Sequence, residues 1–295
     1  LENLKDVEDN PNYTFIKGDI SDSKIVNEIV SDGVDYIVNF AAESHVDRSI
    51  EEPEIFINTN VLGAQVLLNA AKEHGIEKFV QVSTDEVYGS LGETGYFTEE
   101  TSLAPNSPYS ASKTSADLMV RAYRETFGLS TNITRCSNNY GPYQFPEKLI
   151  PLFTSNAMED KKLPLYGDGK NVRDWLHVKD HCRAIDLVMR KGKDGEIYNI
   201  GGNNEKTNIE ITEAILDVLE KPRSLIKFVK DRPGHDKRYA IDSSKIQEEL
   251  GWEPEYTFEE GIKETIDWYV NHQDWWKKIK SGEYKDYYEK MYGDK

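Results

Sequence analysis

Residues 78–89, KFVQVSTDEVYG, place two adjacent acids directly after a short apolar run. The run at 78–83 has the composition of a buried strand. Asp85 and Glu86 follow at its carboxyl end, and no basic residue stands next to them in the sequence. Because neighbouring carboxylates repel each other, this pair indicates either a solvated turn or a site that uses the repulsion.

Strand-like and helix-like segments alternate on both sides of this stretch. Strands are expected at 13–20, 35–42, 78–83 and 130–136, with helices at roughly 24–30, 53–74 and 108–127. This alternation with short connections predicts parallel strands, right-handed crossovers and helices on both faces of the sheet. Ligands bind beyond the carboxyl ends of strands in such sheets, which is where the two acids stand.

Local capping signals support the expected helices. Ser21 is a candidate N-cap for the first helix, and Gly75 suits the C-terminal cap of the second. Ser107 and Pro108 suit the N-cap and first turn of the third. We therefore predict an α/β fold with a Rossmann-like, doubly wound parallel sheet.

The second half of the chain is less regular. Loops rich in Gly, Pro and Asn accompany an aliphatic helix near 208–219, and the tail at 268–295 is aromatic and charged. We expect a dinucleotide-binding domain at 1–140 and a smaller, mixed α/β substrate-binding lobe at 141–295, some of whose segments return to the first domain. The tail is interpreted as a terminal helix pair that packs its aromatic side chains on the body.

Composition restricts the classes of function. The 295 residues carry a formal net charge of −17, which argues against nucleic-acid or anionic-membrane binding because both need basic patches. No apolar run reaches the length of a membrane span, and no secretory signal is visible. Cys136 and Cys182 are far apart and indicate no disulfide framework, and the histidines do not show metal-ligand spacing. We expect a cytoplasmic protein without a metal site.

Tyr109 and Lys113 form the second chemical signal, in the string PYSASK. Their i, i+4 spacing places both side chains on one helix face, and an ammonium near a phenol lowers the pKa of the phenol, which can then act as a base. The spacing also occurs at 13/17 in an expected strand and at 166/170 among glycines. Only the pair at 109/113 has a capped helix beneath it, although an ordinary surface pair remains the alternative.

In combination with other strings, this order of motifs resembles the extended short-chain dehydrogenase/reductases, in the branch that modifies sugar nucleotides. More closely it is similar to the dTDP-glucose 4,6-dehydratases of that branch. The resemblance rests on KGDI at 17–20, NFAAESHVDRSI at 39–50, STDEVYG at 83–89, YSASK at 109–113, RCSNNYGPYQFPEKLIP at 135–151, PLYGDGKNVRDWLHVKDHCRAI at 164–185, YNIGGNNEKTN at 198–208 and DRPGHDKRYAID at 231–242.

The sequence departs from this branch in one respect. The family opens with a strand and a Gly-x-x-Gly-x-x-Gly turn that approaches the cofactor pyrophosphate, whereas Gly18 and Gly33 are isolated here. The segment at 13–20 resembles the family's third strand. The expectation is therefore that the chain lacks an N-terminal segment, binds NAD poorly as given and is inactive.

The resemblance implies a reaction in which bound NAD lends a hydride. Tyr109, as phenolate, takes the proton of the sugar 4-hydroxyl, and Lys113 assists. Glu86 would remove the C5 proton and Asp85 would protonate the departing 6-hydroxyl, while Thr84 orients the 4-oxygen. Since ionising one acid raises the pKa of the other, one proton tends to stay on the pair. A solvated Asp-Glu turn is the competing interpretation.

The family also implies binding residues. For NAD these are Asp19, Ile20, Ala41, Ala42, Glu43, Ser44, Thr59, Tyr109, Lys113 and Asn139. For the sugar nucleotide they are His45, Thr84, Asn138, Lys148, Leu149, Pro164, Leu165, Tyr166, Arg173, Asn208, Asp231, Arg232, Pro233, Gly234 and His235. Arg173 suits a diphosphate because its planar fork binds two oxygens, unless it pairs with Asp174. A satisfied, partly buried histidine is the alternative interpretation of His45.

The implied function is a lyase of the hydro-lyase type, which converts dTDP-glucose to dTDP-4-keto-6-deoxyglucose for deoxysugar synthesis such as that of rhamnose. Related epimerases carry small or neutral residues at the positions of Asp85 and Glu86, and related decarboxylases usually carry Ser-Glu. A UDP-sugar epimerase or decarboxylase is one alternative, and a non-catalytic nucleotide-sensing module is another. The family further implies a homodimer through the helices at 53–74 and 108–127, which simple core packing would explain equally well.

Overall fold

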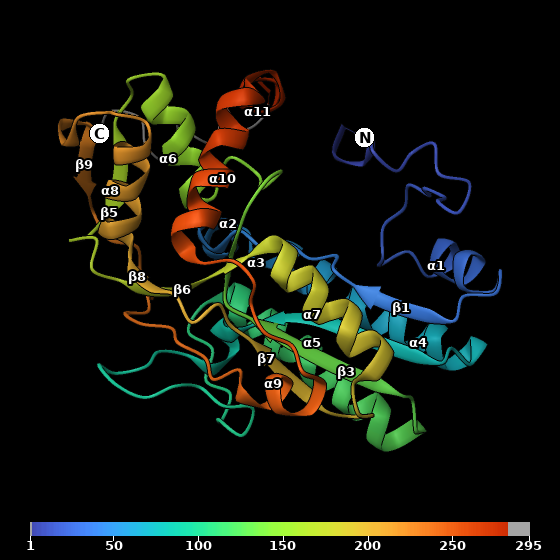
Figure 1. The fold of residues 1–295 in the computed structure, drawn as a ribbon. Helices are drawn as coiled ribbons and strands as arrows, with labels where there is room; N and C mark the ends of the chain where they lie inside the picture. The colour runs from blue at the N-terminus through green and yellow to red at the C-terminus, as the bar shows by residue number, and fades with distance from the viewer. Residues whose placement is uncertain (1, 283–295) are drawn as a thin grey trace.

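The structure, a computed structural model, describes residues 2–282. Its larger sheet is parallel, with the strand order β1–β2–β3–β7 (Figure 1). These strands are β1 (Tyr36–Asn39), β2 (Lys78–Thr84), β3 (Thr131–Cys136) and β7 (Ile197–Ile200). The pairing of β2 with β3 runs from Phe79 opposite Thr131 to Thr84 opposite Cys136, so the carboxyl ends of these two strands lie level.

Helices cover both faces of this sheet, as Figure 1 shows for α5 behind it and α7 in front. One face packs on α1 (Ser23–Val30), α4 (Ala64–His74) and α5 (Pro108–Phe127). The other packs on α7 (Val178–Lys191) and α9 (Ser244–Leu250). Phe79 and Ile133 belong to the first core, and Ile200 belongs to the second. The predicted Rossmann-like, doubly wound arrangement is confirmed.

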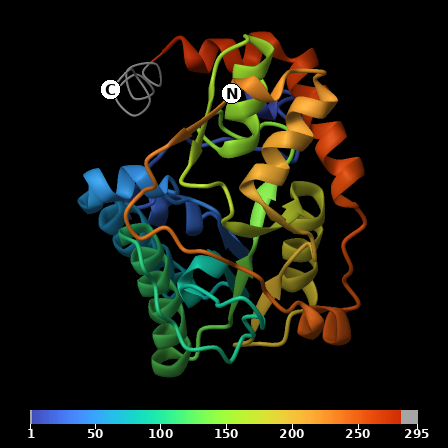
Figure 2. The same ribbon diagram turned by 90° about the vertical axis from the view of Figure 1, so that its left-hand side faces the viewer.

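A second lobe surrounds two smaller sheets, at one end of the molecule in Figure 2. One sheet contains β4 (Asn138–Tyr140), β6 (Val172–His177) and β8 (Glu205–Thr207), with β6 and β8 antiparallel, and the other pairs β5 (Leu163–Tyr166) with β9 (Ile226–Val229). Its helices are α6 (Leu149–Met158), α8 (Asn208–Val218), α10 (Phe258–Asn271) and α11 (Gln273–Lys280). Because β4 begins two residues after β3 ends, this lobe lies beyond the carboxyl ends of the larger sheet.

Several of the expected helix caps are found. The Ser107 hydroxyl accepts a hydrogen bond from the backbone N–H of Ser110, and Pro108 occupies the first turn of α5. Gly75 ends α4 with φ +67°, a left-handed conformation that a side chain would strain. These caps fix where α5 begins, and therefore where Tyr109 and Lys113 lie.

The expected strand at 13–20 was wrong. The segment is extended but forms no ladder with any strand in residues 2–282, and a backbone that pairs with no neighbour is not a strand. The cap of α1 was also misassigned. The Asp22 carboxylate accepts from the N–H of Lys24 at 2.9 Å, whereas the Ser21 hydroxyl donates to Asp19.

The expected helix at 53–74 is not continuous. Pro53 starts a short helix, α3 (Pro53–Phe56), which is followed by a π-helix, η2 (Ile57–Gly63), before α4 begins. In the π segment, the Asn60 side chain accepts from the Glu43 N–H at 2.8 Å and donates to the Glu43 carbonyl and to the Ser112 hydroxyl. The wider turn therefore coincides with a buried link between the loop after β1 and α5.

The remaining short elements are η1 (Glu2–Leu4), α2 (Val46–Glu51), η3 (Asp85–Tyr88) and η4 (Arg223–Leu225). The aromatic tail forms α10 and α11 up to residue 280, with Trp276 buried, while the rest of that prediction, 283–295, lies outside the described residues. Within residues 2–282, no helix has both the length and the apolar surface needed to cross a bilayer. The same residues contain no cluster of three or more metal-ligating side chains.

Candidate active site

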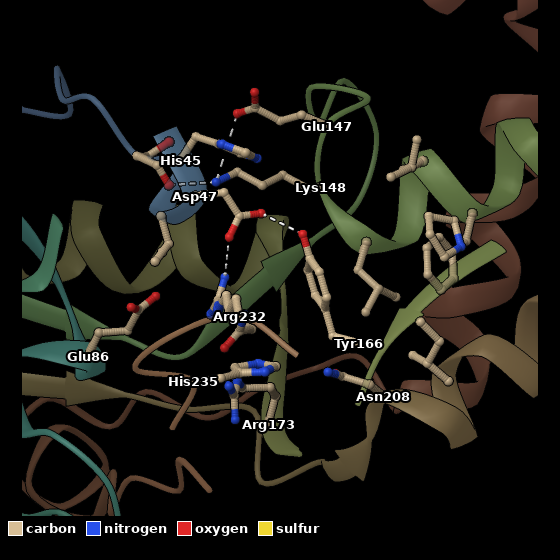
Figure 3. Close-up of a pocket in the computed structure, with 18 of the residues that line it drawn as sticks. His45, Asp47, Glu86, Glu147, Lys148, Tyr166, Arg173, Asn208, Arg232 and His235 are labelled. Carbon is tan, nitrogen blue, oxygen red and sulfur yellow. Dashed lines mark hydrogen bonds and ion pairs between the residues drawn. The ribbon is translucent and has the colours of Figure 1, made fainter. Parts of the chain in front are cut away.

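The ends of β1, β2 and β3 open onto one cavity of about 180 Å³, which the second lobe closes (Figure 3). Ser44, Glu86 and Asn138 come from the segments that follow β1, β2 and β3. The other predicted binding residues that line the cavity are His45, Lys148, Leu149, Pro164, Leu165, Tyr166, Arg173, Asn208, Arg232 and His235. Segments more than 180 residues apart in the sequence are therefore brought to one place.

The paired acids have different surroundings. Asp85 is buried, and burial followed by the nearby Glu86 raises its pKa well above the ordinary range of a carboxyl. Burial also raises the pKa of Glu86, but Arg232, Arg173 and Lys148 oppose this rise. Glu86 faces the cavity and its three cations, so the charge distribution favours a protonated Asp85 beside an ionised Glu86. This geometry excludes the alternative of a solvated turn.

Thr84 ties the acids to the end of β2. Its hydroxyl accepts from the Glu86 N–H at 3.2 Å and donates to Asp85 Oδ1 at 3.3 Å. Asp85 Oδ2 has no hydrogen-bond partner within residues 2–282. The buried carboxyl thus keeps one oxygen available for a proton.

Tyr109 and Lys113 both lie buried on α5, as their spacing predicted, but their predicted mutual effect is not found. Lys113 Nζ donates to the Val82 carbonyl at 2.7 Å. Burial and the charge of Glu86 raise the pKa of Tyr109 well above its usual range, and the Thr84 hydroxyl opposes this rise. The expectation that Lys113 lowers the pKa of Tyr109 does not hold in this structure, because the phenol is dehydrated and faces Glu86.

His45 caps α2 through Nδ1, which accepts from the Arg48 N–H at 3.3 Å. The proton of the neutral ring is therefore on Nε2. Burial, followed by the positive charge of Lys148, lowers the pKa of His45 to about 4. His45 is consequently neutral near pH 7 and is a hydrogen-bonding group, not a charge, at the cavity wall.

Arg173 does not pair with Asp174. The two residues are neighbours on β6 and point to opposite faces. Arg173 donates to the carbonyls of Val172 and Asp236 and stacks on Tyr239, whereas Asp174 accepts from the N–H groups of Gly202 and Asn204. Arg173 therefore reaches the cavity with its charge unneutralised by Asp174, as phosphate binding requires.

The loop at 231–235 lies along the cavity wall. Its Arg232 and His235 line the cavity, while Asp231 holds His235 through a 2.6 Å contact between Oδ1 and Nδ1. Gly234 makes the turn with φ +66°. Asp231, Pro233 and Gly234 are not themselves among the lining residues, so the loop positions the side chains of Arg232 and His235.

The predicted cofactor residues fall into two groups. Ala41, Ala42, Glu43 and Ser44 follow β1 directly, and Thr59 lies in η2 beside Asn60, which holds Glu43. Asp19 and Ile20 lie away from this edge, beside a separate apolar cavity formed with α1, β1 and α4. Of the predicted cofactor residues, Ser44 lines the first cavity, whereas Asp19 and Ile20 line the second.

Asn139 lies in β4, three residues after the end of β3. Its amide donates to the Ser137 carbonyl at 3.0 Å and its oxygen accepts from His181 Nδ1 at 2.8 Å. The Lys113 ammonium and the Tyr109 hydroxyl supply hydrogen-bond donors at these strand ends of the kind that a ribose needs. The strand ends therefore fit the expected NAD.

The comparisons with known proteins agree with this architecture. The family model described as GDP-mannose 4,6 dehydratase matches residues 1–265. A dTDP-glucose 4,6-dehydratase of Xanthomonas campestris is 53% identical, covering 97% of this chain and 87% of the relative. The chain belongs to the dTDP-glucose 4,6-dehydratase family.

Solved dTDP-glucose 4,6-dehydratases have the same fold. The Streptomyces venezuelae structure, determined with NAD bound, superposes with a TM-score of 0.93 at 51% identity and covers 94% of this chain and 86% of its own. The Bacillus anthracis structure, also with NAD, has a TM-score of 0.88 at 56% identity, with the same coverage.

Two charged cavity residues of this dTDP-glucose 4,6-dehydratase family member were missed in the sequence. Asp47 accepts from Tyr166 Oη at 3.0 Å and pairs with Arg232 Nη1 at 3.4 Å (Figure 3). Glu147 lies 4.0 Å from Lys148, whose Nζ donates to the Ser44 carbonyl. Both stand inside strings that carry the family resemblance, but no local pattern distinguishes a buried acid from an exposed one.

Proposed function

We propose that this protein dehydrates dTDP-glucose to dTDP-4-keto-6-deoxyglucose with bound NAD. The observation that carries the proposal is the pair at the end of β2, in which a buried, proton-holding Asp85 adjoins a cation-facing Glu86. An elimination of water needs one acid and one base at the same time. Identities near 50% to dTDP-glucose 4,6-dehydratases over nearly the whole chain support it.

NAD, when bound, supplies an acceptor for the C4 hydride and returns that hydride to C6. Tyr109 takes the proton of the 4-hydroxyl, and Thr84, the last residue of β2, orients the 4-oxygen. Lys113, fixed by the Val82 carbonyl, holds its ammonium on the same helix face. Because burial raises the pKa of Tyr109, the phenolate that takes this proton needs a positive charge nearby to stabilise it.

Glu86 and Asp85 then act as a pair. Glu86 removes the C5 proton, whose acidity the 4-ketone has raised. Asp85 gives a proton to the departing 6-hydroxyl, and water leaves. The two roles follow from the surroundings, since Arg232, Arg173 and Lys148 all favour the charged form of Glu86, whereas burial and the charge of Glu86 keep the pKa of Asp85 high although Arg173 opposes them.

The basic wall of the cavity would bind the dTDP part. Arg173, Arg232 and Lys148 supply positive charge in a chain of net charge −17. Asn208, Tyr166 and His45 supply neutral hydrogen-bonding groups. An acidic protein can hold an anionic ligand in this way, because the local cations act in a partly dehydrated site.

The test is incubation of the full-length protein with dTDP-glucose, followed by detection of the 4-keto product by its absorbance in alkali. Turnover of dTDP-glucose is expected, with no conversion of UDP-glucose under the same conditions. Conversion of a UDP-sugar alone would favour an epimerase or decarboxylase and refute the proposal. The same assay on residues 1–295 tests the expected inactivity of this polypeptide, which the comparisons do not support.

We further infer a homodimer, a cytoplasmic location and a division between the two domains near residue 140. The dimer is supported by apolar side chains that are about half exposed on the elements named for it, namely Ile57, Leu62 and Leu118. Where exposed apolar side chains form one contiguous patch, they mark an interaction surface.

A further inference from the structure

Arg135 is a buried cation to which the mechanism above gives no role. It lies on β3 with a side chain only 3% exposed. Its Nε donates to Asp117 Oδ2 at 3.0 Å, and its Nη1 donates to Tyr88 Oη at 3.0 Å. A buried charge costs free energy unless it is paired and hydrogen-bonded, so the two partners fix the guanidinium in place.

The two partners belong to different halves of the site. Asp117 lies on α5 one turn after Lys113 and two turns after Tyr109. Tyr88 is the last residue of η3, the turn that begins with Asp85 and Glu86. One guanidinium therefore joins the helix of the oxidation step to the turn of the elimination step.

We propose that Arg135 is a positioning residue that fixes the position of α5, which carries Tyr109 and Lys113, relative to η3, which carries Asp85 and Glu86. The inference rests on the proposed function, since the two halves matter only if one substrate meets both. Arg suits the role because its planar guanidinium donates in fixed directions, whereas a lysine ammonium is a single point charge. Misplacement of a reacting group by about 1 Å can cost about 10²-fold in rate.

The Tyr88 end of this link is rigid. Tyr88 Oη donates to Asn199 Oδ1 at 2.8 Å, and its ring stacks on Phe97 at 5.0 Å. Asn199 in turn donates to the Phe97 carbonyl. A Tyr88→Phe change removes the hydrogen bonds of the hydroxyl to both Arg135 and Asn199 but keeps the stacked ring.

The ion pair of Arg135 with Asp117 also affects the pKa of Lys113. Asp117 Oδ1 has no hydrogen-bond partner within the described chain, so its charge is not shared with a second donor. Burial lowers the pKa of Lys113, and Asp117 on the same helix and Cys136 on β3 oppose this lowering. Arg135 thus holds in place the carboxylate that helps Lys113 keep its proton.

The experiment compares Tyr88→Phe and Arg135→Lys in the full-length, NAD-loaded protein with two matched controls, Tyr36→Phe and Arg190→Lys. The controls remove the same groups from exposed pairs with Glu77 and Asp186. Amide hydrogen exchange of residues 84–89 is measured without substrate, and NADH absorbance at 340 nm is followed through a single turnover.

Tyr88→Phe is expected to raise exchange at 84–89 and to slow the decay of NADH by about 10-fold while its formation stays within about twofold. Arg135→Lys is expected to slow both phases by about 10-fold or more. Neither control should change either readout. If Arg135→Lys fails to fold, the Tyr88→Phe variant still tests the proposed role of Arg135.

Two outcomes overturn the proposal. In the first, exchange at 84–89 in Tyr88→Phe stays at the parent level. In the second, exchange rises but both NADH phases remain within twofold of the parent, which would make Arg135 a structural residue only. Failure of the parent protein to turn over dTDP-glucose would instead refute the proposed function, and the exchange measurement would still report on the link.

Discussion

Replacing Asp85 with Asn separates the oxidation from the loss of water. Asparagine has nearly the same shape, and its oxygen can still accept from the Thr84 hydroxyl as Asp85 Oδ1 does at 3.3 Å. Asp85 Oδ2, which has no partner within residues 2–282, becomes an amide that cannot release a proton. Asp85→Asn therefore removes the proton donor without changing the packing.

The size of the effect follows from the chemistry lost. A positioned general acid contributes about 10²- to 10⁴-fold, which is about 2.7–5.4 kcal/mol at 1.36 kcal/mol per tenfold. Because burial and Glu86 already keep Asp85 uncharged, the substitution leaves the net charge around Glu86 unchanged. We expect KM to change by no more than about twofold, because substrate binding uses the other cavity wall.

The assay is stopped-flow absorbance at 340 nm in a single turnover of dTDP-glucose. NADH should form at the parent rate and then persist, decaying about 10²- to 10⁴-fold more slowly. An Asp186→Asn variant, which alters an exposed acid paired with Arg190, serves as the control. NADH decay within threefold of the parent would refute the assignment of Asp85 as the acid.

The pH dependence gives an independent check. Asp85 must be protonated to act, and its pKa is raised, so parent activity should fall as pH rises through that raised pKa. Glu86 must be ionised, so activity should also fall as pH drops through its own raised pKa. In Asp85→Asn the alkaline fall should disappear while the acid fall remains. An unchanged alkaline fall would assign it to another group.

Three further predictions concern other parts of the site. Tyr109→Phe should abolish NADH formation itself while leaving the melting temperature close to that of the parent, and formation within tenfold of the parent would contradict its role as the base. Asp47→Asn should weaken the hold on Tyr166 and Arg232 and raise KM by about 10-fold, since each charged hydrogen bond is worth about 1.5–3 kcal/mol; a lower kcat at constant KM would argue against this. Leu118→Arg should convert the inferred dimer to a monomer in light scattering, and an unchanged mass would exclude α5 from the interface.

Much of the fold could be predicted from the sequence because its signals are local. The helix that carries Tyr109 follows from Ser107, Pro108 and a helical period, and the structure has all three. The strand at 78–84 likewise follows from its composition. The segment at 13–20 was misassigned because its composition is strand-like, whereas a strand also needs a neighbour that no local pattern reveals.

The site was predictable as a set of residues but not as an electrostatic system. The strings of the family resemblance contain most of the cavity wall, including Lys148 and Arg232. The sequence does not show how close these residues lie in space. The three cations that face Glu86 stand 62 to 146 positions after it in the sequence, so their effect on its charge could not be foreseen. Asp47 and Arg135 were missed for the same reason, since each acquires its role only from a partner on another element.

The π-helix at 57–63 sets the phase of two helical segments. In an α-helix each residue turns the chain by about 100°, so a straight helix from 53 would fix the direction of every later side chain. A π segment adds a residue to its hydrogen-bonded ring and thereby breaks that dependence. Asn60 can face Glu43 and Ser112 while the residues after 63 turn their apolar side to the sheet. One continuous helical stretch can therefore direct a polar side chain to one neighbour and its later apolar side chains to the sheet, because the π segment changes the rotation between them and no loop is needed.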